Sequence, residues 1–258
     1  MSGTPTTGGP ARLLVINPNT SPEMTAAIHR AAQEAAGPAF VVETVCATSG
    51  PRSIEGHFDE AMSALGTLEW VLQRDAEVDG YVFACFSAHL AIDAARELSS
   101  KPVVGIAEAG MALATFLGRR FSIVTTSRRW QPILEDAVRL YGYESRCASV
   151  RSSGLAVLDL ERLPREQVLE RLVSEARRAV SEDGAEAIVL GCAGMADLDT
   201  RLRAELDVPI VESVAAGVGL ACTLARLGLG TSKAVTYQPV QPREVVGLPE
   251  RFRRVYES

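Results

Sequence analysis

The feature that most constrains the fold of this chain is an internal repeat. The segment KPVVGIAEAGMALA at 101–114 matches VPIVESVAAGVGLA at 208–221, with Pro102 opposite Pro209 and a separation of 107 positions at every matched residue. Self-similarity of this kind indicates structural units of one type placed side by side. We therefore expect two halves that fold alike and face one another across a cleft.

Apolar runs that end in turn residues alternate with amphipathic segments in both halves. The runs predict strands, and the segments at 58–76 and 165–184 predict helices. Alternation of strands and helices favours parallel sheets with helices on both faces. The predicted fold is therefore α/β, with two pseudosymmetric lobes and an active site between them. Its strands are expected within 12–20, 40–50, 79–86, 101–109, 120–127, 185–194 and 208–214.

The repeat also predicts where the lobes divide. We expect a first lobe from 12–103 together with 213–235, and a second lobe from 104–212. Residues 1–11 contain mostly small and polar side chains, which favours a flexible tail, and 236–258 is rich in prolines and charges, which favours a surface extension.

Two of the five cysteines occupy the same place in both halves. Cys85 and Cys192 are 107 positions apart, and each follows an apolar run and precedes small residues. A single free cysteine is most often a small buried hydrophobe. A repeated one at a strand end is better explained by function, and the helix expected to begin after each would lower its thiol pKa. The pair therefore predicts two reactive thiols facing one ligand.

Polar residues at the ends of other predicted strands belong to the same cleft. Ligands of open parallel sheets bind beyond the carboxyl ends of the strands, and this rule brings Asn17, Thr125 and Thr126 towards the two thiols. Ser21 and Pro22 suit the N-cap and first residue of a helix. The loop before them would present free N–H groups, which suit an anionic or carbonyl-bearing ligand.

Two opposed thiols are best suited to proton transfer. A metal would require more ligands, and a redox pair would usually be close in sequence. A thiolate on one face could remove a proton from a carbon beside a carbonyl, while a thiol on the other face delivers one. The configuration would invert, and donors in the loops would stabilise the enolate oxygen. An acidic C–H bond makes a cofactor unnecessary.

Composition and charge argue against other classes. The net charge is −6 with basic residues scattered, so no nucleic-acid partner is expected. The uncharged run 213–225 is shorter than the roughly 20 residues of a spanning helix, so no membrane segment is expected. The three histidines form no ligand-spaced pairs, so no metal site is expected. An odd number of cysteines without a C-x-x-C pair, and a start unlike a secretory signal, favour the cytoplasm.

The motifs VINPNTS, ATSGPRSIEG, VFACF, FSIVTTS and VLGCAGMADL, in this order, resemble those of the aspartate/glutamate/hydantoin racemase superfamily, most closely its hydantoin and allantoin racemase branch. The resemblance implies a cofactor-independent racemase that acts on a small molecule and assembles from identical subunits. It also implies that Cys85 and Cys192 are catalytic, and that Asn17, Thr125 and Thr126 contact the substrate.

One motif departs from that branch. Its members usually continue the first cysteine as CFGDPG, whereas this chain reads CFSAHL. Phe86 stands where amino-acid racemases of the superfamily carry a polar residue, which favours a cyclic ureide over a free amino acid. His89 could tune Cys85 or touch the substrate, although a structural role is commoner for a histidine in a first helical turn. We also expect substrate contacts from Ser49, Phe86, Ser87, His89, Ala193 and Gly194.

The leading prediction is therefore racemisation of a hydantoin, allantoin or similar cyclic ureide. Two alternatives are also isomerases: an amino-acid racemase of the Asp/Glu type, and a cis–trans isomerase of an unsaturated diacid, in which a cysteine adds as a nucleophile. A third alternative is a two-lobed small-molecule binding protein without catalysis. Thiol reactivity separates this last class from the others.

Overall fold

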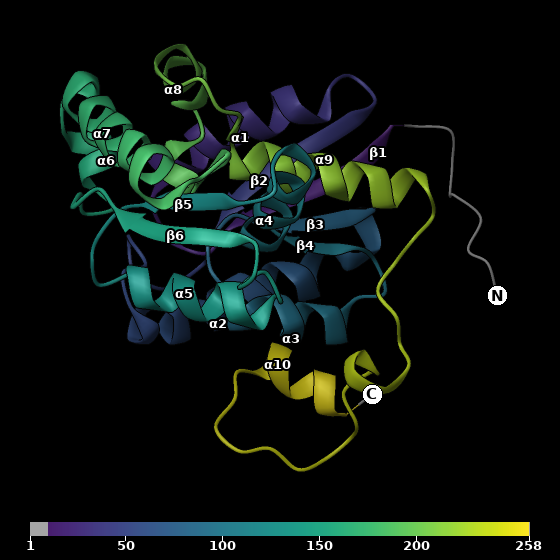
Figure 1. The fold of residues 1–258 in the computed structure, drawn as a ribbon. Coiled ribbons are helices and arrows are strands. Elements are labelled where there is room, and N and C mark those ends of the chain that lie inside the picture. Colours follow the sequence, from purple (N-terminus) through teal and green to yellow (C-terminus); the bar gives the residue numbers. More distant parts are fainter. Residues whose placement is uncertain (1–9, 258) are drawn as a thin grey trace.

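Residues 10–257, which the computed structural model describes, form two four-stranded parallel sheets (Figure 1). The strand order is β2-β1-β3-β4 in the first sheet and β6-β5-β7-β8 in the second, so the same order occurs twice. The predicted fold class is confirmed. The strands are Ala11–Asn17 (β1), Phe40–Cys46 (β2), Gly80–Phe83 (β3), Val103–Gly105 (β4), Phe121–Thr125 (β5), Cys147–Ser152 (β6), Ala187–Leu190 (β7) and Ile210–Val211 (β8).

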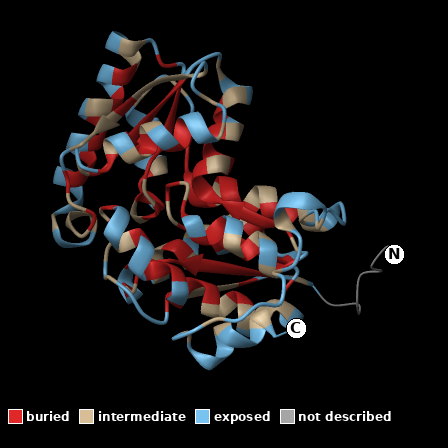
Figure 2. Ribbon diagram, turned by 90° about the horizontal axis from the view of Figure 1, so that it is seen from below, coloured by how far each residue is buried: buried red, intermediate tan, exposed pale blue. Residues whose placement is uncertain are grey.

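Helices flank both sheets, and their outer faces are exposed while the central strands are largely buried (Figure 2). The helices predicted at 58–76 and 165–184 are α2 and α7. The helices are Pro22–Ala36 (α1), His57–Arg74 (α2), Leu90–Leu98 (α3), Ile106–Leu117 (α4), Gln131–Leu140 (α5), Asp159–Arg162 (α6), Arg165–Asp183 (α7), Asp199–Glu205 (α8), Ser213–Arg226 (α9) and Glu250–Arg253 (α10).

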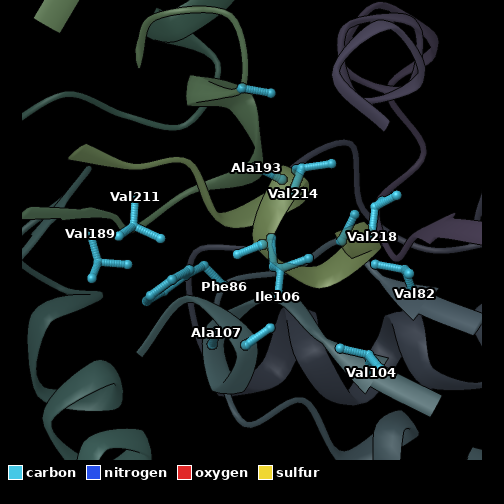
Figure 3. Packing of buried hydrophobic residues seen from close by; sticks show 14 of the residues in the cluster. Val82, Phe86, Val104, Ile106, Ala107, Val189, Ala193, Val211, Val214 and Val218 are labelled. Carbon is cyan, nitrogen blue, oxygen red and sulfur yellow. The ribbon is translucent and has the colours of Figure 1, made fainter. Parts of the chain in front are cut away.

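Helices α4 and α9 join the two halves. They begin 107 positions apart and pack directly against each other. A Cβ atom on Gly110 of α4 would lie 3.1 Å from Val189 of β7, and one on Gly217 of α9 would lie 3.2 Å from Val82 of β3. Each helix therefore packs on the sheet of the other half, in the apolar cluster of Figure 3. The lobe boundaries stay a prediction. They assign α4 to the second lobe and α9 to the first, so that each helix belongs to the lobe on whose sheet it packs.

Three details differ from the sequence-based expectations. Strand β6 was not predicted, because only Val150 in it is buried and the apolar alternation is weak at this sheet edge. The strands expected within 101–109 and 208–214 are short, because α4 and α9 begin almost at once. The predicted tail at 1–11 falls mostly outside the described residues, and Ala11 already pairs with β2.

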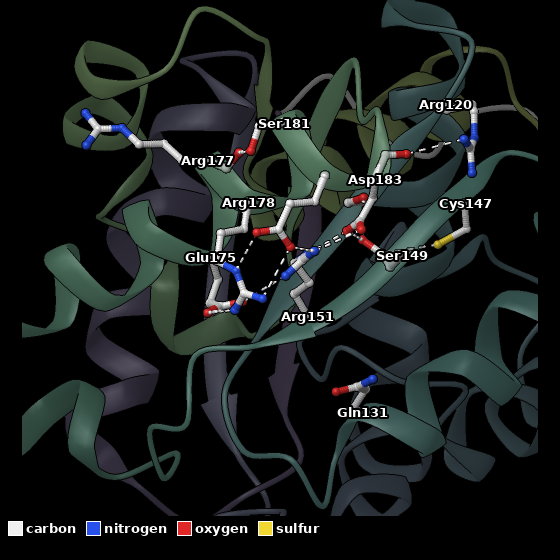
Figure 4. A network of polar contacts seen from close by, with 12 residues as sticks. Arg120, Gln131, Cys147, Ser149, Arg151, Glu175, Arg177, Arg178, Ser181 and Asp183 are labelled. Carbon is white, nitrogen blue, oxygen red and sulfur yellow. Dashed lines mark hydrogen bonds and ion pairs between the residues drawn. The ribbon is translucent and has the colours of Figure 1, made fainter.

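Ion pairs attach the edge strand β6 to helix α7, as Figure 4 shows. The guanidinium of Arg151 donates to Asp183 at 2.6 and 2.8 Å and to Glu182 at 2.7 Å. Arg178 of α7 binds the same Glu182. The charges hold the strand in place where its own side chains bury little apolar surface.

The C-terminal segment runs along the outside of the first lobe, with α10 near α2 (Figure 1). Phe252 packs against the apolar cluster between β3, α2 and α3. Lys233 donates to the carbonyl of Glu97 at 3.1 Å. Among the described helices, none combines the length and the hydropathy needed to cross a membrane.

Two helical glycines give a matched test of the packing. A Cβ atom on Gly66 of α2 would overlap the backbone of Ser49, at 2.7 Å from its nitrogen, whereas one on Gly219 of α9 would meet nothing within 4 Å. We expect Gly66→Ala to lower the free energy of unfolding by about 1–3 kcal/mol, and Gly219→Ala to raise it by about 0.5–1 kcal/mol. Urea denaturation of both variants measures the two changes, and equal effects would contradict this packing.

Candidate active site

A cavity lies beyond the carboxyl ends of β1, β3, β5 and β7, so residues of both halves line it. Cys85 and Cys192 each follow the end of their strand by two residues, and both line this cavity. The matched thiols are thus brought to one site. The lining residues are Asn17, Pro18, Asn19, Met24, Ile54, Ala84, Cys85, Phe86, Thr126, Trp130, Val157, Gly191, Cys192 and Ala193.

The first loop at the cavity is held by its own amides. The Asn17 side chain donates to Asn19 Oδ1 at 2.8 Å and to Thr25 Oγ1 at 3.0 Å. Ser21 accepts from the backbone at the start of α1, and Pro22 is the first helical residue, so the predicted cap is confirmed. Because both N–H groups of the Asn17 amide have partners, this side chain shapes the loop that borders the cavity.

The matching loop of the second half leaves one hydroxyl available. Thr125 Oγ1 donates to the carbonyl of Gly191 at 2.9 Å, which joins the ends of β5 and β7. Thr126 Oγ1 is buried without a hydrogen-bond partner and Thr126 lines the cavity. Buried polar groups normally find a partner. The Thr126 hydroxyl is therefore suited to bind a ligand.

The cavity is closed on one side by a contact between the halves. The indole of Trp130, just before α5, donates to the carbonyl of Phe86 at 3.3 Å. Sequence reasoning missed Trp130 and the apolar wall residues Met24, Ile54 and Val157, because apolar residues in a sequence do not reveal which of them border a ligand.

Burial raises the pKa of both thiols. That of Cys192 rises to about 11, with the N–H of Gly194 acting in the opposite direction. The pKa of Cys85 rises more strongly, because of burial and the nearby charge of Glu60. The expectation that helix N-termini lower these pKa values was wrong, because α3 begins only at Leu90 and desolvation outweighs any helix effect.

Two predicted contact residues, His89 and Ser49, do not line the cavity. His89 is buried and caps α3: its Nδ1 accepts from Ala91 N at 3.2 Å, while its Nε2 is 2.9 Å from Ser63 Oγ. Burial lowers its pKa to about 4, so His89 is neutral near pH 7. Ser49 is exposed and its backbone packs against α2 at Gly66. His89 and Ser49 therefore lie away from the cavity.

Ser87 and Gly194 lie next to the two thiols without lining the cavity. Ser87 Oγ donates to Glu60 Oε1 at 2.6 Å and lies 3.7 Å from Cys85 Sγ. Glu60 itself is buried, which raises the pKa of its carboxyl group. Sequence reasoning missed Glu60. The sequence offered one indication, which is that Glu60 falls on the same face of the predicted helix as small and apolar residues.

The arrangement is suited to a compact ligand with an acidic C–H bond. Two thiols, one free hydroxyl and apolar walls meet at one place. Residues 10–257 contain no group of three or more His, Cys, Asp or Glu side chains placed to hold a metal ion. Thiols in such a place can act as acids and bases or as nucleophiles.

Comparison with known proteins gives consistent matches over most of the chain. The family model of Asp/Glu/hydantoin racemases matches residues 13–221. The hydantoin racemase of Pseudomonas sp. (strain NS671) is 45% identical over 244 residues, which cover 94% of this chain and 97% of that protein. This similarity in sequence confirms the predicted family.

Solved structures agree with the sequence matches. Allantoin racemase from Pseudomonas fluorescens has a TM-score of 0.88 and 40% identity, over 92% of this chain and 100% of that chain. Allantoin racemase from Klebsiella pneumoniae has a TM-score of 0.87 and 42% identity, over 95% and 98% of the two chains. The chain therefore belongs to the Asp/Glu/hydantoin racemase family and is an isomerase of the racemase type.

Proposed function

We propose that this racemase inverts the carbon beside a carbonyl in a hydantoin, in allantoin or in a similar cyclic ureide, without a cofactor. The observation that carries the proposal is that Cys85 and Cys192 come from opposite halves and line the same cavity. The relatives named hydantoin racemase and allantoin racemase support this substrate class.

In the proposed mechanism, one sulfur atom acts as base and the other as acid. A thiolate takes the proton from the substrate carbon, and the opposite thiol delivers a proton to the other face. The Thr126 hydroxyl donates to the carbonyl oxygen as negative charge develops there. Phe86 and Ala193 line the cavity, while Asn17 and Thr125 hold the loops that carry these groups.

The lining of the cavity favours a cyclic ureide over a free amino acid. Among the described residues that line it, none is a lysine, arginine or histidine. An α-carboxylate would therefore have no cationic partner, whereas a neutral ureide needs only hydrogen-bond donors and acceptors. Phe86 is almost fully buried. It stands at the position where amino-acid racemases of the superfamily are expected to carry a polar residue, so this wall offers a free amino acid no polar contact from that side chain.

Two further expectations stay predictions alongside this function. All five cysteines are free, in keeping with a reducing compartment such as the cytoplasm. The other expectation is that the protein assembles from identical subunits. Gel filtration with light scattering measures the assembly.

Solvent deuterium tests the roles of the thiols. We expect the unmodified enzyme to incorporate deuterium from solvent into each enantiomer of a hydantoin panel that includes allantoin. Removing an acid or base group should lower racemisation about 10²–10⁴-fold, so Cys85→Ser and Cys192→Ser should both lose it, with residual exchange confined to opposite enantiomers. NMR and chiral chromatography follow the two processes.

Cys46→Ser is the matched control for this experiment, because Cys46 is half-buried but does not line the cavity. It should racemise at the normal rate. Full racemisation by either single variant at Cys85 or Cys192 would rule out the two-thiol mechanism. If no hydantoin, allantoin or amino acid exchanges in the unmodified enzyme, the proposed substrate class fails.

The raised thiol pKa values predict an alkaline rate profile. The base must be a thiolate, and with a pKa of about 11 for Cys192 only a small fraction is ionised at neutral pH. Below that pKa, each added pH unit raises the thiolate fraction about tenfold. We expect kcat/KM to rise between pH 7 and pH 9 in initial-rate polarimetry, on a substrate without its own ionisation there. A decline over that interval would contradict a buried thiol as the base.

A further inference from the structure

The two thiols have different neighbours, although the repeat places them at matched positions. At the repeat separation of 107 residues, Ser87 corresponds to Gly194 and the buried Glu60 corresponds to Gln167, which is exposed on α7. A hydroxyl and a carboxylate therefore stand beside one sulfur atom and are missing at the matched places beside the other. The repeat is symmetric in backbone and asymmetric in chemistry.

On the Cys85 side, the hydrogen bonds have a definite direction. The short bond of 2.6 Å from Ser87 Oγ to Glu60 Oε1 uses the only proton of that hydroxyl. Ser87 Oγ is also placed to donate to Cys85 Sγ, 3.7 Å away, but the single hydroxyl proton cannot serve both acceptors and the carboxylate is the closer one. Donation from Ser87 would favour the Cys85 thiolate, so holding that proton on Glu60 withdraws this support, and the negative charge of Glu60 opposes a second one on the sulfur.

On the Cys192 side, the neighbour is a backbone donor. Burial and the charges of Glu55 and Glu161 raise the pKa of Cys192, and the backbone N–H of Gly194 lowers it by favouring the thiolate. A side chain is poorly accommodated there, because a Cβ atom on Gly194 would lie 2.9 Å from Leu160 Cδ1 and 3.7 Å from the Cys192 sulfur. Donation without a nearby hydrogen-bonded carboxylate makes this sulfur atom the easier one to ionise.

We infer that Glu60, acting through Ser87, is a positioning residue that keeps Cys85 protonated and leaves Cys192 as the thiol that ionises first and acts as the base. The inference rests on the proposed two-thiol function and adds a direction to it. It also explains the serine in the motif CFSAHL, because Ser87 lies two residues after Cys85 and connects it to Glu60.

The proton count of one turnover follows from this assignment. Cys192 thiolate takes the substrate proton, so a C–H bond breaks and an S–H bond forms. The S–H bond of Cys85 breaks, and a C–H bond forms on the opposite face of the carbon. Cys85 is then a thiolate beside Glu60, and the enzyme returns to its active protonation state when Cys85 gains a proton from water and Cys192 releases one.

Other titratable groups act on both sulfur atoms. On the Cys192 side these are Glu55 and Glu161, whose charges raise the pKa of that thiol, and no described hydrogen bond links either carboxylate to its sulfur. His57, largely exposed on α2, has its Nδ1 3.8 Å from Glu60 Oε2. Cys192 and Tyr141 also interact electrostatically with Cys85. His89, on the same loop as Cys85, is neutral near pH 7 because burial lowers its pKa to about 4. Glu60 is thus the one of these groups that combines a negative charge with a hydrogen-bonded path to the Cys85 sulfur.

Alkylation of each cysteine by iodoacetamide over a range of pH tests the inference without any substrate. Peptide mass spectrometry separates the five sites, and the pH midpoint of each profile does not depend on access to the sulfur. In the unmodified enzyme, we expect Cys192 to become reactive at lower pH than Cys85. In Glu60→Gln, removal of the charge should raise the Cys85 rate about tenfold or more at a fixed pH below its midpoint, and the Cys192 profile should stay in place.

Three variants separate this role from a general effect on the fold. Glu60→Asp keeps the charge and should preserve most of the difference between the profiles. Ser87→Gly copies the Gly194 side and should bring the two profiles together. Gln167→Glu adds a carboxylate at the exposed matched position and should change neither profile. Unchanged Cys85 profiles in both Glu60→Gln and Ser87→Gly would overturn the inference.

Racemisation kinetics provide a second readout. Enantiomers have equal free energies, so kcat/KM must be the same for the two substrate enantiomers. If the two thiols are unequal, kcat and KM can still differ between the enantiomers, but both must differ by the same factor. We expect that factor to shrink in Glu60→Gln. If alkylation shows the asymmetry but no cyclic ureide is racemised, the proposed function fails while the positioning role stands. If racemisation needs both thiols but Glu60→Gln changes no profile, the positioning role alone fails.

Discussion

The crossing of α4 and α9 is the contact on which the rest of this structure depends. Gly110 and Gly217 have no side chain, so each helix can pack so closely on a strand of the opposite sheet that even a Cβ atom would be crowded there. The two sheets are thereby fixed with the carboxyl ends of their central strands around one cavity. Cys85 and Cys192 belong to different lobes, and this exchange of helices holds the lobes together so that both thiols line one cavity.

Desolvation then determines the chemistry of that cavity. It raises the pKa of both thiols, so reactivity depends on what each sulfur atom meets locally rather than on an intrinsically acidic cysteine. On one side the neighbours are Ser87 and Glu60. On the other, the backbone N–H of Gly194 lowers the pKa of Cys192 while the charges of Glu55 and Glu161 raise it. A backbone duplicated in both halves can in this way hold one acid and one base, as stereochemical inversion requires.

Much of the fold and half of the site could be predicted from residue patterns. The repeat identified the matched cysteines, and the strand ends identified Thr126, which has a free hydroxyl at the cavity. The role expected for His89 depended on how its ring would be oriented, and the ring in fact caps α3 and binds Ser63. Glu60 could not be found because its contact with Ser87 joins residues 27 positions apart on different elements.

The sequence by itself determined the two-lobed α/β fold and the pairing of Cys85 with Cys192, because a repeat and its periodicity are written along the chain. It also indicated the family, through the resemblance of its motifs. Only the tertiary structure decided that both sulfur atoms are desolvated, that Thr126 is left without a partner and that Glu60 lies behind Cys85. The physical reason is that burial and hydrogen-bond direction are set by the packing of distant segments, and local sequence does not record them.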